Sequence, residues 1–186
     1  MVRNIIPPHV ECIFVRQSEQ LGLGHAVLCA ERAVAGDPFA VLLADDFLTD
    51  YAPGVIADLV DAFEKTGNSQ LSIMPVDEAY ISQYGVIIPS SDGHGVIGVV
   101  EKPRQVDAPS NLASIGRYVL TSDIFDILKV LPTGSGGEIQ LADALNLHAQ
   151  AGLIESIELR GKRFDCGSVD GFMSASAHEY AKRLGN

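Results

Sequence analysis

The chain has 186 residues, 47% of them hydrophobic and 20% charged, which is the composition of an ordinary globular protein with a sizeable core. Thirteen basic against twenty-four acidic residues give a net charge of -11, which argues against a nucleic-acid-binding surface or an anionic-membrane surface. No apolar run approaches the roughly 20 residues that span a bilayer. Residues 1–8 lack the long apolar core of a leader peptide, so we expect a cytoplasmic protein with no membrane partner.

Strand and helix patterns alternate along the chain, and no linker is long enough to split it into independent domains. A turn cluster between 85–88 and 96–100 indicates a hairpin, so the sequence predicts a mostly parallel sheet with an added antiparallel portion. The expected strands are 11–16, 39–44, 71–74, 85–88, 96–100, 116–120 and 153–159, and the expected helices are 25–33, 53–66, 123–131, 138–150 and 168–184.

The apolar run over 39–44 stops on two adjacent carboxylates, Asp45 and Asp46. A run this short after a turn signal predicts a fully buried parallel strand, and open α/β sheets bind ligands at the carboxyl ends of such strands. Carboxylates there suit Mg2+, which takes one or two of them and leaves its other positions to water and substrate phosphates. Capping of a turn by one of the two is an equally good interpretation.

Gly22 and Gly24 lie between a strand pattern and a helix pattern. Glycines at such a junction let the backbone approach a flat or anionic group. The third glycine of a dinucleotide-binding fingerprint would fall at Val27, so a pyrophosphate loop of the Rossmann type is not supported. A turn that needs a positive φ is the simpler alternative.

The strand pattern over 96–100 ends by presenting Glu101 and Lys102. Glu101 could accept hydrogen bonds from sugar hydroxyls, and Lys102 could meet a phosphate as a point charge. Asn111, in the polar stretch that follows, could both donate and accept hydrogen bonds. A surface ion pair and plain loop structure are the alternatives.

Asp165 precedes a glycine turn in the segment R-F-D-C-G. It could supply a second ligand to a metal held by Asp45, although the two residues are far apart in sequence. Capping of the following helix by Asp165 or Ser168 is the alternative.

Together these segments resemble bacterial UDP-glucose pyrophosphorylases, also called UTP-glucose-1-phosphate uridylyltransferases. The resemblance extends over nearly all of the chain, in the family's order, and eight ordered motifs make it specific. The motifs are Gln17 to Ala26 (Q-S-E-Q-L-G-L-G-H-A), Leu42 to Asp46 (L-L-A-D-D), Tyr84 to Val86 (Y-G-V), Val99 to Pro103 (V-V-E-K-P), Pro109 to Ala113 (P-S-N-L-A), Gly116 to Leu120 (G-R-Y-V-L), Gly137 to Leu141 (G-E-I-Q-L) and Phe164 to Gly167 (F-D-C-G).

The resemblance implies an α/β fold of the nucleotide-diphospho-sugar transferase type, with a Rossmann-like mixed, mainly parallel sheet flanked by helices. Residues 1–186 would form a partial nucleotidyltransferase domain with no separate second domain. The implied reaction converts UTP and glucose 1-phosphate into UDP-glucose and pyrophosphate by in-line attack of the sugar phosphate on the α-phosphorus, with Mg2+ as the cofactor. A homo-oligomer is implied as well.

The resemblance also assigns roles by position in the motifs, with Lys102 and Asp45 as the catalytic residues. Asp46 then becomes the less fitting metal ligand of the adjacent pair. The implied contacts are Gln17 and Gly22 for uracil, Asp45 and Asp165 for Mg2+, Tyr84, Gly85, Glu101 and Asn111 for glucose, and Lys102 for the sugar phosphate.

The sequence departs from the family pattern in one large respect. The family opens with a glycine-rich G-x-G-T-R loop and a downstream P-K-E-M-L-P segment, which hold the triphosphate, and neither occurs here. We therefore expect the chain to correspond to the family's C-terminal portion, N-terminally incomplete, with little or no activity by itself. A non-catalytic sugar-nucleotide binding or regulatory module is the alternative.

Overall fold

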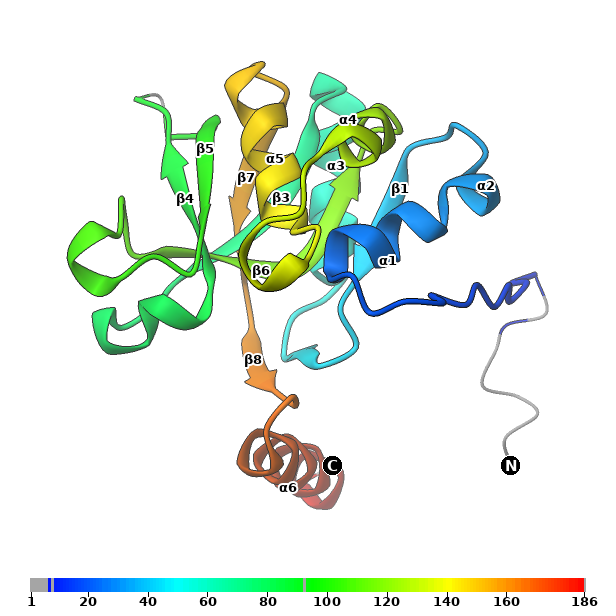
Figure 1. The fold of residues 1–186 in the computed structure, drawn as a ribbon. Helices are drawn as coiled ribbons and strands as arrows, with labels where there is room; N and C mark the ends of the chain where they lie inside the picture. The colour runs from blue at the N-terminus through cyan, green and yellow to red at the C-terminus, as the bar shows by residue number, and fades with distance from the viewer. Residues whose placement is uncertain (1–6, 8, 92, 186) are drawn as a thin grey trace.

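The computed structural model of the protein describes residues 7, 9–91 and 93–185 (Figure 1). Most of residues 1–8, on which the expectation about a leader peptide rests, therefore lie outside the described residues. The body consists of a mixed sheet with helices on both faces, and the C-terminal helix stands apart from it beyond a separate strand pair.

The main sheet has six strands in the described part of the chain, and β6 is its centre. β6 pairs antiparallel with β1, β3 and β4, whereas β3 pairs parallel with β7 and β4 pairs antiparallel with β5. A separate pair, β2 with β8, is also antiparallel. The strands are β1 (Phe39–Leu42), β2 (Asp46–Thr49), β3 (Ser69–Pro75), β4 (Gly85–Pro89), β5 (Val96–Glu101), β6 (Leu112–Leu120), β7 (Ile154–Glu158) and β8 (Lys162–Asp165).

Two helical layers enclose the main sheet, with α1, α4 and α5 on one face and α3 on the other (Figure 1). α6 follows β8 and lies below the sheet in this view. The α-helices are α1 (Leu23–Cys29), α2 (Glu31–Val34), α3 (Val55–Thr66), α4 (Ile124–Val130), α5 (Leu141–Gln150) and α6 (Val169–Gly185), and short 3-10 helices are η2 (Glu78–Gln83), η3 (Gln105–Asp107) and η4 (Ser135–Gly137).

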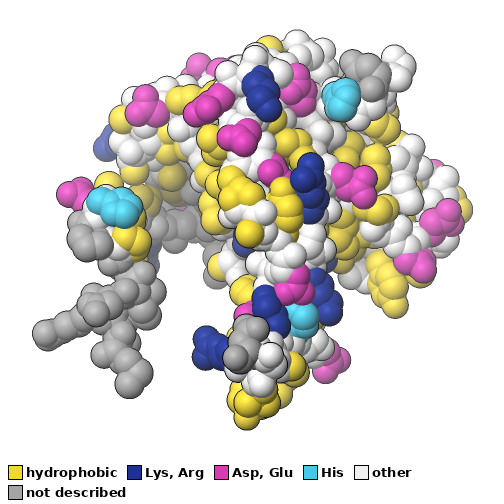
Figure 2. Space-filling model, turned by 180° about the vertical axis from the view of Figure 1, so that it is seen from behind, with side chains coloured by type: hydrophobic (Ala, Val, Ile, Leu, Met, Phe, Trp, Pro, Cys, Tyr) yellow, Lys and Arg dark blue, Asp and Glu magenta, His cyan; other side chains and the backbone are white. Residues whose placement is uncertain are grey.

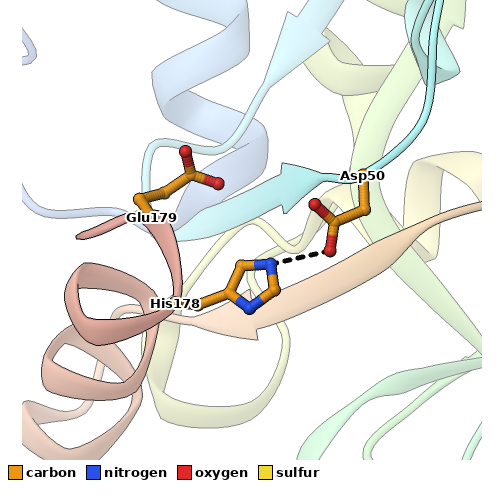
Figure 3. Close-up of side chains that lie close together, drawn as sticks. All are labelled: Asp50, His178 and Glu179. Atoms are coloured by element: carbon orange, nitrogen blue, oxygen red, sulfur yellow. Dashed lines mark hydrogen bonds and ion pairs between the residues drawn. The ribbon is translucent and has the colours of Figure 1, made fainter. Parts of the chain in front are cut away.

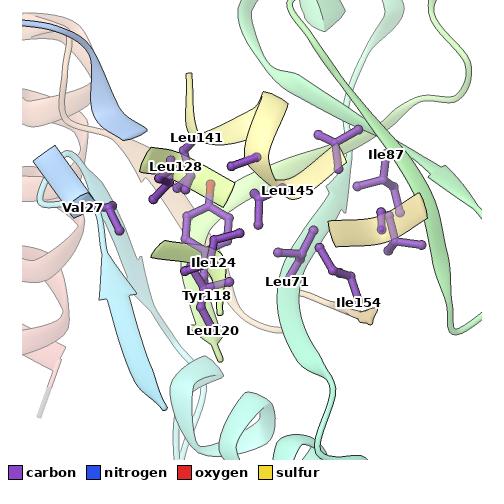
Figure 4. Close-up of a cluster of buried hydrophobic side chains, with 14 of the residues drawn as sticks. Val27, Leu71, Ile87, Tyr118, Leu120, Ile124, Leu128, Leu141, Leu145 and Ile154 are labelled. Atoms are coloured by element: carbon purple, nitrogen blue, oxygen red, sulfur yellow. The ribbon is translucent and has the colours of Figure 1, made fainter. Parts of the chain in front are cut away.

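Alternation along β6 divides the core between the two faces. Tyr118 and Leu120 point into the larger hydrophobic cluster beneath α1, α4 and α5 (Figure 4), whereas Val119 packs with Leu59 of α3. Successive side chains of a strand point to opposite faces of a sheet, so one strand supplies both clusters. Burial in the larger cluster raises the pKa of the Tyr118 phenol to about 12.

Several expected elements are confirmed. β4 and β5 form the expected hairpin, and the helix expected over 53–66 is α3, which ends at Gly67 with φ of 73°. Gly67 adopts the left-handed conformation that closes a helix, which a residue with a Cβ adopts at a cost. The mixed sheet flanked by helices also matches the expected Rossmann-like architecture.

Three expectations about strands are wrong. Residues 11–16 form no strand, and Phe14 there is 95% exposed, because no described strand lies alongside to pair with it. The run from Phe39 is not a fully buried parallel strand, because β1 pairs antiparallel with β6 and leaves Ala40 and Leu42 exposed. The sheet is not mainly parallel either, since in the described residues only the β3–β7 ladder is parallel.

No helix among the described residues combines the length and the apolar character needed to cross a bilayer.

Two leucines of α5 test how far the larger cluster stabilises the fold. Leu145 is 2% exposed and Leu147 is 45% exposed. Leu145→Ala should lower the free energy of unfolding by about 2 to 5 kcal/mol, because it leaves a cavity in a packed core. Leu147→Ala on the same helix should change it by less than about 1 kcal/mol. Urea denaturation followed by circular dichroism measures both, and equal effects would contradict the assigned burial.

Candidate functional site

Two carboxylates that are far apart in sequence, Asp45 and Asp165, lie together in the structure. The β2–β8 ladder places Asp46 opposite Asp165, and the backbone N–H of Cys166 donates to the carbonyl of Asp45 at 2.7 Å. A Cβ built on Gly167 would lie 3.1 Å from Asp165 Oδ1 and 3.5 Å from Asp45 Oδ2, so both carboxylates converge on this turn. Carboxylate oxygens of this kind are the donors that Mg2+ prefers, so the pair fits the expected metal.

Asp46, the neighbour of Asp45, has a different environment. It is 6% exposed, and its Oδ2 accepts a hydrogen bond from the backbone N–H of Gly116 at 2.9 Å. Its Oδ1 accepts from both Nε and NH2 of the Arg163 guanidinium, each at 2.5 Å. Burial is the largest influence on Arg163 and lowers the pKa of its guanidinium, but the Asp46 carboxylate and the Tyr84 hydroxyl together raise that pKa above its ordinary value. Both carboxylate oxygens of Asp46 therefore have partners inside the protein, in an ion pair and a backbone hydrogen bond.

Arg163 makes two further contacts from the same guanidinium. Its NH1 donates to the hydroxyl of Tyr84 at 3.1 Å, and its centre lies 5.2 Å from the Tyr84 ring centroid. Its NH2 lies 3.4 Å from Asp165 Oδ2. Sequence reasoning assigned no role to Arg163, although one signal was available: residues two apart on a strand share a face, and Asp165 is two residues on.

Arg117 holds the turn before Asp46 against the sheet. It donates from NH1 to the carbonyl of Leu43 at 2.9 Å and from NH2 to the carbonyl of Asp46 at 2.6 Å. Burial lowers the pKa of Arg117, although the carboxylates of Asp46 and Asp45 oppose the shift. The turn that carries Asp45 is thus fixed by hydrogen bonds to β6.

The hairpin of β4 and β5 brings together the residues expected to bind sugar and phosphate. Gly85 lies opposite Glu101 in the ladder, and a Cβ at Gly85 would be 3.2 Å from Glu101 Oε2. The backbone N–H of Lys102 donates to the carbonyl of Tyr84 at 3.0 Å. Lys102 has φ of 44°, a conformation that is uncommon outside glycine and is enriched at functional sites.

A cleft of about 640 Å³ opens beside this hairpin, and a smaller cavity of about 60 Å³ adjoins it, with Val99, Glu101 and Gln140 lining both. Leu23 lines the smaller cavity, which links it to the start of α1. Sequence reasoning gave no site role to the acidic and amide side chains that α5 and the segment before it contribute to the cleft. They are Glu138, Gln140, Asp143 and Asn146.

Gln17 and Gly22, expected to contact uracil, lie together at the start of α1. The Gln17 amide nitrogen donates to the carbonyl of Gly22 at 3.1 Å and lies 3.0 Å from Nδ1 of His25. Gly22 has φ of 91°, and a Cβ there would be 2.9 Å from the carbonyl oxygen of Ile139, so this position requires glycine. Their contact with a base stays a prediction.

Asn111 lies apart from the cleft residues. Asn111 is exposed, and its backbone carbonyl accepts from the backbone N–H of Val76 at 3.0 Å. It does not line either cavity beside the hairpin. A sugar contact from Asn111 therefore also stays a prediction.

A third group of titratable side chains anchors α6 (Figure 3). His178 Nε2 lies 2.7 Å from Asp50 Oδ2, and Thr49 donates to Glu179 at 2.7 Å. The ammonium of Lys182 lies 2.7 Å from Asp50 and 3.3 Å from Glu179, so a cation of the protein already bridges the two carboxylates. From the opposite side, charged and histidine side chains gather where the lowest lobe, α6, meets the body (Figure 2). We assign this group to helix attachment.

Comparison with known proteins shows the family to which this chain belongs. The model of the family described as nucleotidyl transferase matches residues 4–182, and the chain belongs to that family. Within it, the chain is 42% identical over 184 residues to UTP--glucose-1-phosphate uridylyltransferase of Escherichia coli K12, covering 94% of this chain and 60% of that protein. It is 45% identical over 171 residues to UTP--glucose-1-phosphate uridylyltransferase 2 of Staphylococcus saprophyticus, covering 90% and 58%.

Solved structures agree with the sequence relatives. A UDP-glucose pyrophosphorylase complexed with UDP-glucose superposes with a TM-score of 0.86 at 44% identity, covering 90% of this chain and 65% of that one. A UTP-bound enzyme from Acinetobacter baumannii gives 0.85 at 35% identity, covering 96% and 63%. The resemblance to UDP-glucose pyrophosphorylases is thereby confirmed, and the chain spans about 60% of the length of the curated relatives it matches.

Gly116 is a test of the packing around Asp46. A Cβ at Gly116 would lie 2.5 Å from Asp46 Oδ2 and 2.6 Å from Leu43 Cβ. Gly116→Ala should therefore displace the turn that carries Asp45 and lower the free energy of unfolding by about 1 to 3 kcal/mol, the usual cost of overpacking. Urea denaturation measures the loss. Gly185→Ala, where a Cβ has nothing within 4 Å, is the control and should leave stability nearly unchanged.

The attachment of α6 should depend on pH. The hydrogen bond from Lys182, assisted by His178, holds the pKa of Asp50 below its ordinary value of 3.8. A lowered folded-state pKa contributes stability above the ordinary value, and this contribution is lost as the pH falls through the folded-state value.

Asp50→Asn should therefore lower the melting temperature at neutral pH, and its difference from the wild type should shrink as the pH falls from about 5 to about 2. Asp50 has φ of 63°, which asparagine also tolerates, so the change removes charge without straining the backbone. Thermal melts across this range measure the difference, and a gap that is independent of pH would contradict the assignment.

Proposed function

We propose that this chain supplies the uridine-binding, sugar-binding and metal-binding portion of a UTP–glucose-1-phosphate uridylyltransferase. The observation that carries the proposal is the convergence of Asp45 and Asp165 beside a hairpin that presents Glu101 and Lys102. Support also comes from relatives that bear this name at 42% and 45% identity over most of the chain.

In the proposed reaction an oxygen of glucose 1-phosphate attacks the α-phosphorus of UTP. A new phosphorus–oxygen bond forms there as the bond to the β-phosphate breaks, and pyrophosphate leaves. Neither product needs a covalent enzyme intermediate, so the protein contributes positioning and charge neutralisation.

Asp45 and Asp165 would hold Mg2+ in this proposal, because both offer hard oxygen donors at one turn. When bound, the ion would neutralise part of the negative charge of the nucleotide phosphates. A local cation is needed because the chain as a whole carries a net charge of -11.

The hairpin residues would hold the sugar phosphate. The ammonium of Lys102 lies 3.5 Å from Glu101 Oε1, and the Lys102 side chain is 61% exposed, so the ammonium is accessible to a phosphate. Glu101, with an exposed fraction of 27%, would accept hydrogen bonds from sugar hydroxyls. Tyr84 and Gly85 would complete this pocket, and Gln17 and Gly22 would meet the uracil near the adjoining cavity.

A second candidate function is sugar-nucleotide binding without turnover. It is favoured by the charge of the cleft: among the described residues that line it, Lys102 is the one cation, and Glu101, Glu138 and Asp143 are acidic. Such a lining suits a sugar with a diphosphate better than it suits a triphosphate, which needs more positive charge. Turnover by the chain itself would decide for the enzyme.

Calorimetric titration of the chain with UDP-glucose, with and without Mg2+, tests the proposal. We expect binding that is tighter with Mg2+, and Asp45→Asn should weaken the Mg2+-dependent binding by roughly tenfold, about 1.4 kcal/mol. Asp61→Asn, an equal change of charge on the exposed side of α3, is the matched control and should bind as the wild type does.

A coupled assay with UTP, glucose 1-phosphate and Mg2+ completes the test. Little or no turnover by a chain that binds UDP-glucose fits both a partial enzyme domain and a binding module, whereas measurable turnover that Asp45→Asn abolishes supports the enzyme. Absence of Mg2+-dependent UDP-glucose binding would falsify the proposed function.

A further inference from the structure

Arg163 lies between the two halves of the candidate site. Asp165, on the same strand, belongs to the carboxylate pair, and Tyr84, at the start of the hairpin, belongs to the sugar pocket. The guanidinium touches both, with NH1 3.1 Å from the Tyr84 hydroxyl and NH2 3.4 Å from Asp165 Oδ2. Among the described contacts, it is the side chain that bonds to both groups.

The remaining donors of Arg163 fix its own position. Its Nε and NH2 bond to Asp46 Oδ1 at 2.5 Å, and Asp46 is in turn held by the backbone of Gly116 at 2.9 Å. The side chains of Arg163 and Asp46 are 10% and 8% exposed. A planar guanidinium that is bonded at two nitrogens to a buried carboxylate cannot rotate freely, so its other edge is held in a fixed direction.

We infer that Arg163 is a positioning residue that holds the Asp165 carboxylate and the Tyr84 hydroxyl at a fixed separation, and so aligns the metal site with the sugar pocket. Asp46 is the internal anchor of this arrangement. The inference deepens the proposed function and rests on it for the roles of Asp165 and Tyr84.

Charge by itself predicts the opposite effect on metal affinity. A guanidinium 3.4 Å from a metal ligand repels a cation, so removing it should strengthen metal binding if repulsion is its main influence. Positioning predicts weaker binding, because an unrestrained ligand pays conformational entropy when it binds the ion. The sign of the change therefore separates the two explanations.

Arg163→Lys is the decisive variant. Lysine keeps a positive charge opposite Asp46 but lacks the rigid fork that reaches Asp165 and Tyr84 together. We expect the dissociation constant for Mn2+, a spectroscopic probe of the Mg2+ site, to rise roughly tenfold in the chain, as for other groups that orient metal ligands. Electron paramagnetic resonance of free Mn2+ measures it. Arg163→Gln should weaken Mn2+ binding at least as much.

Arg160 offers a matched control from the same part of the chain. Its NH1 donates to the Tyr51 hydroxyl at 3.2 Å, and its guanidinium lies 5.5 Å from the Tyr51 ring centroid. Arg160→Lys removes the same kind of arginine–tyrosine contact away from the carboxylate pair, and it should leave Mn2+ affinity unchanged. Melting temperatures of all variants check their folding, and Arg163→Lys decides alone if Arg163→Gln does not fold.

The outcomes are distinct. Mn2+ affinity of Arg163→Lys within about twofold of the wild type overturns the inference. Tighter binding by Arg163→Gln, or equal weakening by Arg160→Lys, overturns it as well. A wild-type chain that binds Mn2+ but no UDP-glucose contradicts the proposed function, while the comparison of Mn2+ affinities still judges the role of Arg163.

Discussion

The buried ion pair between Asp46 and Arg163 is the interaction on which the candidate site depends. A buried ion pair adds little net stability, because desolvation of both charges offsets their attraction, but loss of either partner leaves an uncompensated charge. Here the pair joins β2 and β8 to the central strand through the backbone of Gly116. It therefore fixes the position of Asp45 and Asp165, which flank it in the sequence and in the ladder.

The site is assembled from parts that have no local connection. Asp165 ends β8, and Asp45 lies in the turn before β2. Glu101 ends β5 of the hairpin, and Lys102 follows it. Because the chain carries a net charge of -11, an anionic substrate needs local cations near these carboxylates. Arg163 and Arg117 both point inward and hold the strand pair and the turn. Among the described residues that line the cleft, Lys102 is the one cation.

Local patterns predicted the parts of the fold whose partners are close in sequence. The β4–β5 hairpin and α3 followed from turn residues and helical periodicity. The strand expected over 11–16 and the buried parallel strand from Phe39 were wrong, because strand formation and burial depend on a pairing partner that periodicity does not identify. The site residues Asp45, Glu101, Lys102 and Asp165 stood out as polar groups at strand ends. Arg163 did not, since its role needs contacts with Asp46 and Tyr84, which are distant in sequence.

The sequence by itself determined the family, the hairpin and the carboxylates that a metal could use, because ordered motifs and short-range periodicity can be recognised without knowledge of tertiary contacts. Only the tertiary structure decided that Asp45 and Asp165 converge and that Asp46 faces inward to Arg163. Two adjacent aspartates are chemically identical in a sequence. They differ in the fold because Asp45 is exposed in the turn before β2, whereas Asp46 is the buried first residue of β2 and meets the guanidinium of Arg163.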